Sequence, residues 1–262
     1  MSQPLTYASY LRLAELLELQ APQSRQAGRE EHDEMLFIVI HQVYELWFKQ
    51  LLHEIDHVIE LLDADDSIRA GRGLRRMLTI LKVMVSQMDV LETMSPLEFL
   101  SFRERLDSSS GFQSAQFREF EFVLGYKRAE IAASFGADES ARARLRQRLE
   151  QPSLWYAVCE FLRRRGSDVG VAPAVTDPTQ PSVAVQTALV DLYRSDNAVA
   201  DLAEKLVDLD EGVQEWRYRH VKMVERTIGN KPGTGGSSGL EYLASTLGRP
   251  IFPDLWAIRA QM

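Results

Sequence analysis

The chain has 262 residues, of which 45% are hydrophobic and 26% charged, with 30 Lys and Arg against 38 Asp and Glu. A chain of this length can bury a core without a metal or a disulfide. Its single cysteine, Cys159, excludes an internal disulfide, a CxxC zinc cluster and a cysteine-held iron–sulfur cluster. The net charge of −8 argues against broad nucleic-acid binding, which favours a basic surface.

The sequence shows no targeting or membrane segment. The stretch from Met1 to Thr6 has neither the basic region nor the apolar region of a secretory signal. The longest uninterrupted apolar run, Met35 to Ile40, is far shorter than the roughly 20 residues that a membrane helix needs. We therefore expect a soluble, cytoplasmic protein without a membrane or nucleic-acid partner.

Apolar residues recur at helical spacing along most of the chain, and strand-like alternation is almost absent, which predicts an all-α fold. The predicted helices are Leu5–Leu19, Glu31–Leu62, Arg72–Glu92, Pro96–Leu106, Phe112–Leu124, Glu139–Glu150, Pro152–Arg165, Ser182–Ser195, Val199–Ile228 and a short one from Leu240. The Pro-containing stretch 166–182 is a possible connector. Because the other connections are mostly short, we expect one helical bundle over residues 1–262 rather than two domains.

The histidines of the predicted helix Glu31–Leu62 do not face the same way. A projection at ~100° per residue places His41 within an apolar stripe that also carries Phe37. His53 and His57 fall toward solvent, on the polar side that carries Glu45. His41 therefore points to where the core should be.

The segment His53-Glu54-Ile55-Asp56-His57 matches the HExxH pattern of zinc peptidases. In that pattern two histidines one helical turn apart bind zinc and the glutamate is the general base. The glycine and third histidine of the longer metzincin pattern do not follow His57. An exposed helix face is the simpler interpretation, and a zinc peptidase stays as an alternative of a different class.

A second inward histidine lies on the predicted helix Val199–Ile228. There His220 follows Trp216 at the spacing of the apolar positions. A histidine on an apolar face is usually a satisfied core residue. Two of them, His41 and His220, on separate helices shift the balance toward a shared pocket.

The predicted helix Pro96–Leu106 begins with a capping box, Ser95-Pro96-Leu97-Glu98. It places Arg103 on one face with Phe99, Phe102 and Leu106. Arg103 could extend to the surface, or its guanidinium could bind a ligand carboxylate beside the aromatic rings.

The glycine-rich stretch 229–239 contains Thr234 and lacks the GK[ST] ending of a Walker loop, so nucleotide binding is poorly supported. A flexible linker and a loop that closes over a ligand through its N–H groups and Thr234 both fit. Taken alone, the residues favour an enzyme with an aromatic or amino-acid-like ligand, and they do not specify haem.

Four blocks of the sequence closely resemble the tryptophan 2,3-dioxygenase family, and they occur in the order expected. They are Leu5–Leu16 (LTYASYLRLAEL), His32–Glu54 (HDEMLFIVIHQVYELWFKQLLHE), Met94–Glu119 (MSPLEFLSFRERLDSSSGFQSAQFRE) and Glu215–Gly239 (EWRYRHVKMVERTIGNKPGTGGSSG). The resemblance implies a haem b enzyme that cleaves the indole C2–C3 bond of L-tryptophan with O2 to give N-formyl-L-kynurenine in tryptophan catabolism.

The resemblance also implies roles for single residues. His220 would be the axial ligand of the haem iron, and Ser110 and Gly111 would lie near the haem. His41 would be the hydrogen-bond partner of the indole N–H. The residues expected around the substrate are Phe37, Phe99, Phe102 and Leu106 at the indole, Arg103 at the carboxylate and Thr234 at the ammonium.

In the family, aromatic residues at the positions of Tyr7 and Tyr10 reach into a neighbouring subunit's site, which implies an oligomer, usually a homotetramer. Related enzymes of secondary metabolism share this pocket and convert tryptophan or methylated tryptophans to oxindoles. Such a haem monooxygenase is the alternative within the haem class.

Overall fold

The computed structural model describes residues 4–107, 109, 111–136, 138–229, 231 and 239–262. Within these ranges every regular element is a helix, which confirms the all-α prediction. The α-helices are α1 (Tyr7–Leu11), α2 (Leu13–Leu16), α3 (Gln23–Gln26), α4 (His32–Asp63), α5 (Ser67–Leu91), α6 (Pro96–Arg103), α7 (Ala115–Leu124), α8 (Ala129–Ser134), α9 (Glu139–Glu150), α10 (Leu154–Arg164), α11 (Val183–Ser195), α12 (Asn197–Ile228), α13 (Leu240–Ala244) and α14 (Pro253–Ala257). The 3-10 helices are η1 (Glu104–Leu106), η2 (Gly111–Gln113) and η3 (Ile258–Gln261).

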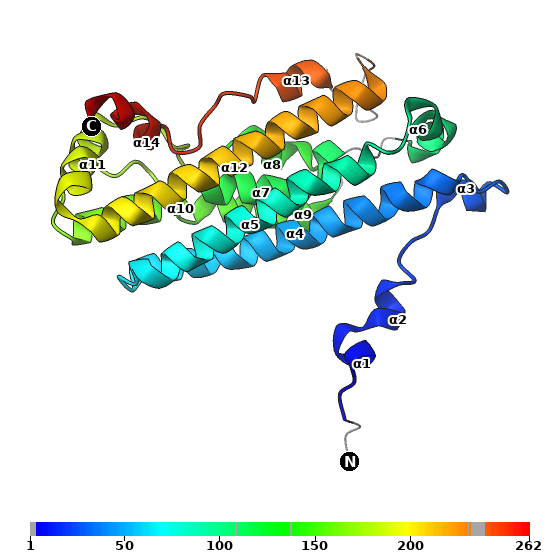
Figure 1. Ribbon diagram of the computed structural model, residues 1–262, viewed down its shortest axis with the longest axis horizontal. Helices are drawn as coiled ribbons and strands as arrows, with labels where there is room; N and C mark the ends of the chain where they lie inside the picture. Colours follow the sequence, from blue (N-terminus) through cyan, green and yellow to red (C-terminus); the bar gives the residue numbers. More distant parts are fainter. Residues whose placement is uncertain (1–3, 108, 110, 137, 230, 232–238) are drawn as a thin grey trace.

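Three long helices form the frame of the molecule. Helices α4, α5 and α12 run side by side along the long axis, and α5 packs against both of the others (Figure 1). Helices α7 and α10 pack against α4, and α9 packs on α7. Helices α11 and α14 gather at one end of the frame, and α6 and α13 lie toward the other end (Figure 1).

Two glycines of this frame sit where helices approach each other closely. A Cβ atom on Gly73 of α5 would lie 2.5 Å from Cγ2 of Val58 on α4. A Cβ atom on Gly212 of α12 would lie 2.8 Å from Cδ1 of Leu78 on α5. Both separations are shorter than side chains tolerate, so a larger residue at either position would force the facing side chain, Val58 or Leu78, to move.

The core of the described residues divides into a long cluster between the helices, a small one where α7, α8 and α9 meet, and another small one near α6. The long cluster includes fully buried residues such as Leu51, Leu74 and Leu209, one from each long helix. The cluster near α6 joins residues of α4, α5 and α6 with Met94, and they are Ile40, Leu91, Met94, Phe99 and Phe102. The predicted inward histidine, His41, follows Ile40 directly and therefore lies at this end.

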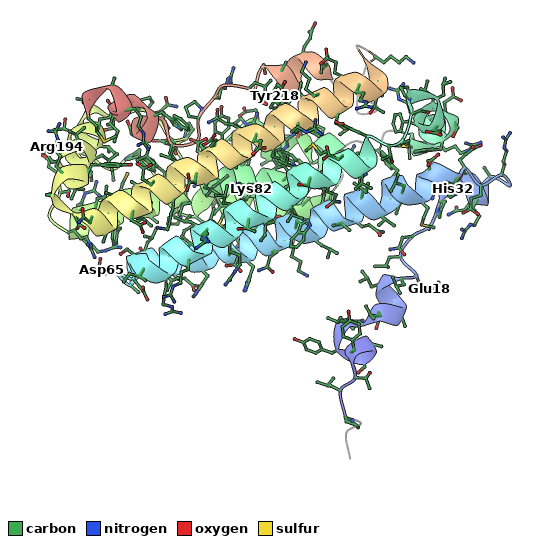
Figure 2. The ribbon with its side chains drawn as sticks, in the orientation of Figure 1. Glu18, His32, Asp65, Lys82, Arg194 and Tyr218 are labelled. Atoms are coloured by element: carbon green, nitrogen blue, oxygen red, sulfur yellow. The ribbon has the colours of Figure 1, made fainter. Side chains whose placement is uncertain are left out.

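The N-terminal segment is an arm that extends away from the body (Figure 1). The prediction of one helix over Leu5–Leu19 is wrong. The helix is interrupted at Arg12, which adopts a left-handed backbone conformation with φ of 52° and separates α1 from α2. The arm's apolar side chains have no core to pack against. Glu18 lies on the arm, apart from His32 at the start of α4 (Figure 2). At the base of the arm, buried Glu34 accepts the N–H groups of Gln23 at 2.8 Å and Ser24 at 2.9 Å.

Other boundaries differ from the predictions for local reasons. Helix α5 begins five residues earlier than the predicted Arg72, because Asp66 caps it by accepting the N–H of Arg69 at 3.0 Å. The predicted Pro96–Leu106 helix is α-helical only to Arg103 and continues as η1. The short helices α3, α8 and α14 were not predicted, since too few residues show periodicity in each of them.

Between α10 and α11, residues 166–182 contain no helix. In the part of the chain that the structure describes, none of the helices is both long and apolar enough to span a bilayer.

Candidate functional site

A large pocket opens at the end of the frame where α4, α5, α6, α7, α12 and α13 meet. The pocket and the solvent space at its mouth together take up about 1700 Å³. Among the predicted site residues, the pocket is lined by Phe37, His41, Phe99, Arg103, Leu106, Gly111 and His220. The structure thus brings together residues from three α-helices and two 3-10 helices that the sequence separates by up to about 180 positions.

Of the remaining predicted site residues, three lie away from the pocket lining and two are outside the described residues. Phe102 is fully buried behind the pocket wall, with its ring centroid 5.6 Å from that of Phe37. Tyr7 and Tyr10 lie on the arm and are 77% and 71% exposed, away from the pocket of their own chain. Ser110 and Thr234 lie outside the described residues.

His41 is held in one tautomer by its own helix. Its Nδ1 lies 2.7 Å from the carbonyl oxygen of Phe37, one turn earlier on α4. A carbonyl oxygen can only accept a hydrogen bond, so Nδ1 carries the proton and Nε2 keeps its lone pair. Burial lowers the pKa of His41, an effect that the hydrogen bond to Phe37 and the charge of Glu45 partly offset. His41 is therefore a neutral imidazole with an accepting Nε2.

His220 is a second neutral imidazole in the same pocket. Its ring lies parallel to the indole of Trp216, one turn earlier on α12, with centroids 5.4 Å apart and an interplanar angle of 5°. Burial lowers its pKa to about 4, helped by the proximity of His41 and Arg118. A neutral imidazole offers a nitrogen lone pair, which is what a metal ion requires of a histidine ligand.

The end of the pocket near α6 is lined by aromatic rings and by the positively charged side chain of Arg103. The rings of Phe37 and Phe99 are 5.7 Å apart, and Phe99 meets Phe102 edge to face at 5.4 Å. The predicted capping box is present, with the N–H of Ser95 donating to Glu98 Oε2 at 2.6 Å. It fixes the start of the helix that ends with Arg103 in the pocket wall. This end can hold a flat aromatic group beside a guanidinium.

The structure corrects the prediction for Glu45. The helix projection put it on the solvent side, yet it lines the pocket because α7 covers that side of α4. Its Oε2 accepts the side-chain N–H of Gln116 at 2.8 Å, and its backbone oxygen accepts the same group at 2.9 Å. A projection of one helix shows an apolar stripe but not which polar residues a neighbouring helix will cover.

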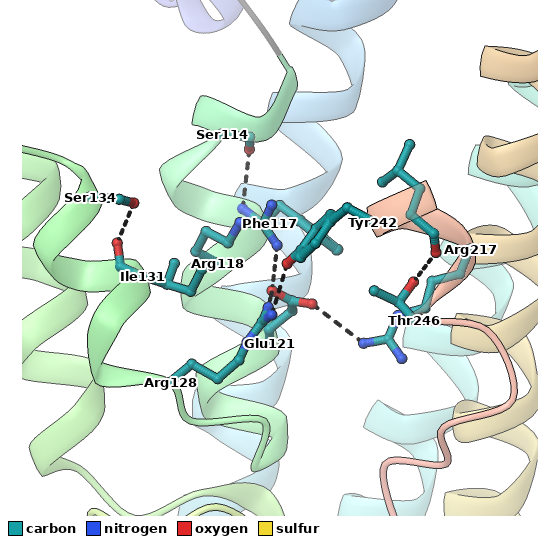
Figure 3. A network of polar contacts seen from close by, with 11 residues as sticks. Ser114, Phe117, Arg118, Glu121, Arg128, Ile131, Ser134, Arg217, Tyr242 and Thr246 are labelled. Atoms are coloured by element: carbon teal, nitrogen blue, oxygen red, sulfur yellow. Dashed lines mark hydrogen bonds and ion pairs between the residues drawn. The ribbon is translucent and has the colours of Figure 1, made fainter. Parts of the chain in front are cut away.

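A buried ionic cluster forms the opposite wall of the pocket, and the sequence reasoning missed it. Glu121 Oε2 accepts from Arg118 Nη1 and Arg128 Nη2, both at 2.7 Å, and Glu121 Oε1 lies 3.4 Å from Arg217 Nη2 (Figure 3). Arg118, Glu121 and Arg217 all line the pocket. The spacing of Arg118 and Glu121, three residues apart, is a sequence pattern that could have indicated an ion pair.

The cluster has more positive than negative charge, and buried hydrogen-bond donors in and beside it have no acceptor among the described residues. Three guanidinium groups face one carboxylate, which gives a formal charge of +2 in a largely buried region. Arg118 Nε and Trp216 Nε1 are buried, and neither has an acceptor among the described residues. Buried donors without partners destabilise a protein, so a ligand with anionic oxygens would satisfy this wall. Together with the neutral His220, the wall fits a haem, which carries an iron and two propionates.

The HExxH segment does not form a comparable centre. His53 and His57 are exposed, and His57 Nδ1 lies 3.3 Å from Glu60 Oε2. Glu54 is buried and pairs with Arg76 Nη1 at 2.8 Å, so it is engaged in an ion pair between α4 and α5. Among the described residues no group of three or more His, Cys, Asp or Glu side chains could hold a metal ion. The structure thus gives the zinc-peptidase alternative no support.

Comparison with known proteins extends the match over nearly the whole chain. The sequence profile of the family described as Tryptophan 2,3-dioxygenase matches residues 1–164 and 180–262. Proteins named tryptophan 2,3-dioxygenase are 59% identical in Herpetosiphon aurantiacus, with both chains fully covered, and 52% identical in Anaeromyxobacter dehalogenans, with 100% of this chain and 97% of the relative covered. The relative of that name in Caulobacter vibrioides is 44% identical, again with both chains fully covered. This chain belongs to the tryptophan 2,3-dioxygenase family.

Proposed function

We propose that this protein is a haem-dependent dioxygenase that cleaves the indole C2–C3 bond of L-tryptophan with O2 to give N-formyl-L-kynurenine. The observation that carries the proposal is one pocket with two neutral imidazoles, His41 and His220, between an aromatic wall with Arg103 and a cationic wall. Relatives that are 59% and 52% identical bear the name of this activity.

The cofactor side of the pocket would be the wall of α7 and α12. His220 would bind the iron, and Arg118, Arg217 and the Trp216 N–H would bind the propionates, which neutralise the surplus charge. Gly111, which lines the pocket, and Ser110 would lie beside the haem. A bound haem b supplies the activation of O2, which no side chain provides.

The substrate side would be the wall of α4 and α6. The rings of Phe37 and Phe99, backed by Phe102, would hold the indole together with Leu106. The lone pair of His41 Nε2 would accept the indole N–H. A guanidinium can bind a carboxylate through two parallel hydrogen bonds, which is the role we assign to Arg103. Thr234 would meet the ammonium.

Binding both ends of tryptophan would orient the reacting ring carbons, and such orientation contributes to the rate. The apolar wall would limit the access of water to the reacting atoms.

The arm supports an oligomer in which subunits complete each other's sites. Tyr7 and Tyr10 are exposed and do not contact the pocket of their own chain. In the homotetramer that we propose, they reach the site of a neighbouring subunit. We further propose that residues 1–262 act as one haem-binding domain in the cytoplasm.

An absorption spectrum tests the cofactor assignment. The purified protein should show a Soret band, and His220→Ala should lose it while keeping its helical circular dichroism. Mutating His53 and His57 together should leave haem content and activity nearly unchanged, which makes this double variant the matched control. A colourless protein with stoichiometric zinc would contradict the proposal and support the zinc peptidase instead.

A further inference from the structure

A hydrogen bond joins the ionic cluster to the helix that follows the glycine-rich stretch. Arg128 Nη1 donates to the hydroxyl oxygen of Tyr242 at 2.8 Å, across 114 positions of sequence (Figure 3). Tyr242 is on α13 and lines the pocket, whereas Arg128 precedes α8 and does not. The bond therefore ties a pocket residue to a group outside the pocket.

In this bond the Tyr242 hydroxyl is the acceptor, so its own proton is not donated to Arg128. A guanidinium has donors and no acceptor, so the phenolic oxygen of Tyr242 accepts from Arg128. The oxygen still has its own proton to donate, and among the described residues none is found to accept it. Two other tyrosines differ in this respect, because Tyr44 donates to Met84 O at 2.7 Å and Tyr193 donates to Glu204 Oε1 at 2.8 Å.

The ring of Tyr242 is held from two sides. It packs edge to face against Phe112, with centroids 5.4 Å apart and an interplanar angle of 72°. Arg128 is fixed in turn by the ion pair of its Nη2 with Glu121 at 2.7 Å. Because Arg128 occupies one side of the hydroxyl, the proton is left on another side. The hydroxyl is therefore preoriented before any ligand binds.

The surroundings of this hydroxyl favour an anionic acceptor. Arg118 and Arg217, which line the same pocket, share a single carboxylate with Arg128, so the wall beside Tyr242 carries surplus positive charge. A neutral O–H donor adds a directed hydrogen bond to such a wall without adding further charge repulsion. Carboxylate oxygens accept the strongest hydrogen bonds from such donors.

We propose that the Tyr242 hydroxyl donates its proton to a carboxylate of the cofactor, and that Arg128 is the positioning residue that orients this hydroxyl. The inference rests on the proposed haem and adds two residues to its binding. It also makes α13 part of the cofactor site, so that haem binding and the placement of this helix stabilise each other.

The rate of porphyrin loss from the full-length protein tests the proposal. The protein is loaded with haem b or with haem dimethyl ester, which lacks free carboxylates, and the loss to an excess of haem-capturing globin is followed by absorbance. A hydrogen bond to a charged group is strong enough for Tyr242→Phe to speed haem loss about tenfold or more. Loss of the dimethyl ester should not change, since no carboxylate is there to accept.

Tyr193→Phe is the matched control, because this hydroxyl also accepts from an arginine, Arg259, at 3.5 Å but lies outside the pocket. It should lose both porphyrins at the wild-type rate. Arg128→Gln should also speed the loss of haem, and it should do so by a smaller factor in the Tyr242→Phe background than in the wild type, because part of its effect acts through the bond that the two residues share.

Equal effects of Tyr242→Phe on haem and on its dimethyl ester would show a merely structural role and overturn the inference. An unchanged rate of haem loss in Tyr242→Phe would overturn it as well. A wild-type protein that takes up no haem would instead contradict the proposed function, and with it the inference. The two failures are thus distinguished by the wild-type protein alone.

Discussion

Hydrogen bonds and burial, rather than residue type alone, decide what the pocket residues can do. His41 is an acceptor at Nε2 because Phe37 takes the Nδ1 proton. His220 remains neutral because burial opposes its charge. The sequence indicated which histidines face inward, because the spacing of apolar residues along a long helix can be read from the sequence alone. It could not indicate Glu45 or the cluster around Glu121, because these polar residues are buried by neighbouring helices that are distant in sequence.

At this scale, we expect Arg103→Ala to raise KM for L-tryptophan about tenfold or more with a smaller change in kcat. The reason is that the substrate carboxylate loses its charged, bidentate hydrogen-bond donor. Steady-state kinetics on the haem-loaded variant measure both constants. Arg103→Lys is the control that keeps the charge and loses the fork geometry, so its KM should lie between those of the wild type and Arg103→Ala. An unchanged KM in Arg103→Ala would refute the role.

At the scale of helices, α4 and α5 hold the pocket wall through two reciprocal bonds that flank His41. The Tyr44 hydroxyl donates to Met84 O at 2.7 Å, and Gln87 Nε2 donates to Ile40 O at 3.1 Å. The sequence predicted both helices from periodicity, and it missed the short helices α3, α8 and α14, whose formation depends on tertiary packing. It also could not show the break at Arg12, where no core selects a continuous helix.

We expect Gln87→Leu to lower kcat/KM for L-tryptophan several-fold, roughly the effect of one hydrogen bond. The loss should be smaller for 1-methyl-tryptophan, which has no indole N–H for His41 to accept, and parallel kinetics with the two substrates make the comparison. Ser86→Ala is the matched control, since it removes a bond within α5 to Lys82 O at 3.1 Å. Equal losses for both substrates would show that Gln87 does not act through His41.

At the scale of the molecule, the buried neutral His220 makes the stability of the haem-free protein depend on pH. The pocket keeps His220 neutral, with a pKa of about 4 against an ordinary value near 6.5. Between these values the unfolded chain binds a proton at this residue and the folded chain does not. The stability of the haem-free protein therefore falls as pH is lowered from about 6.5 to about 4.

Urea unfolding of the haem-free protein at several pH values measures this effect. One proton corresponds to about 1.4 kcal/mol per pH unit within the window. Because His220→Gln removes the titrating group, this variant should lose less stability than the wild type between pH 6.5 and pH 4.5. Parallel losses in the two proteins would show that His220 titrates normally in the folded chain.

The chemical product tests the central claim most directly. The haem-loaded protein is reduced without oxygen, given L-tryptophan and then ¹⁸O₂, and the product is analysed by mass spectrometry. We predict the mass of tryptophan with two added oxygen atoms, both of them labelled, as in N-formyl-L-kynurenine. A product with one labelled oxygen atom would contradict dioxygenation and identify the oxindole-forming monooxygenase instead.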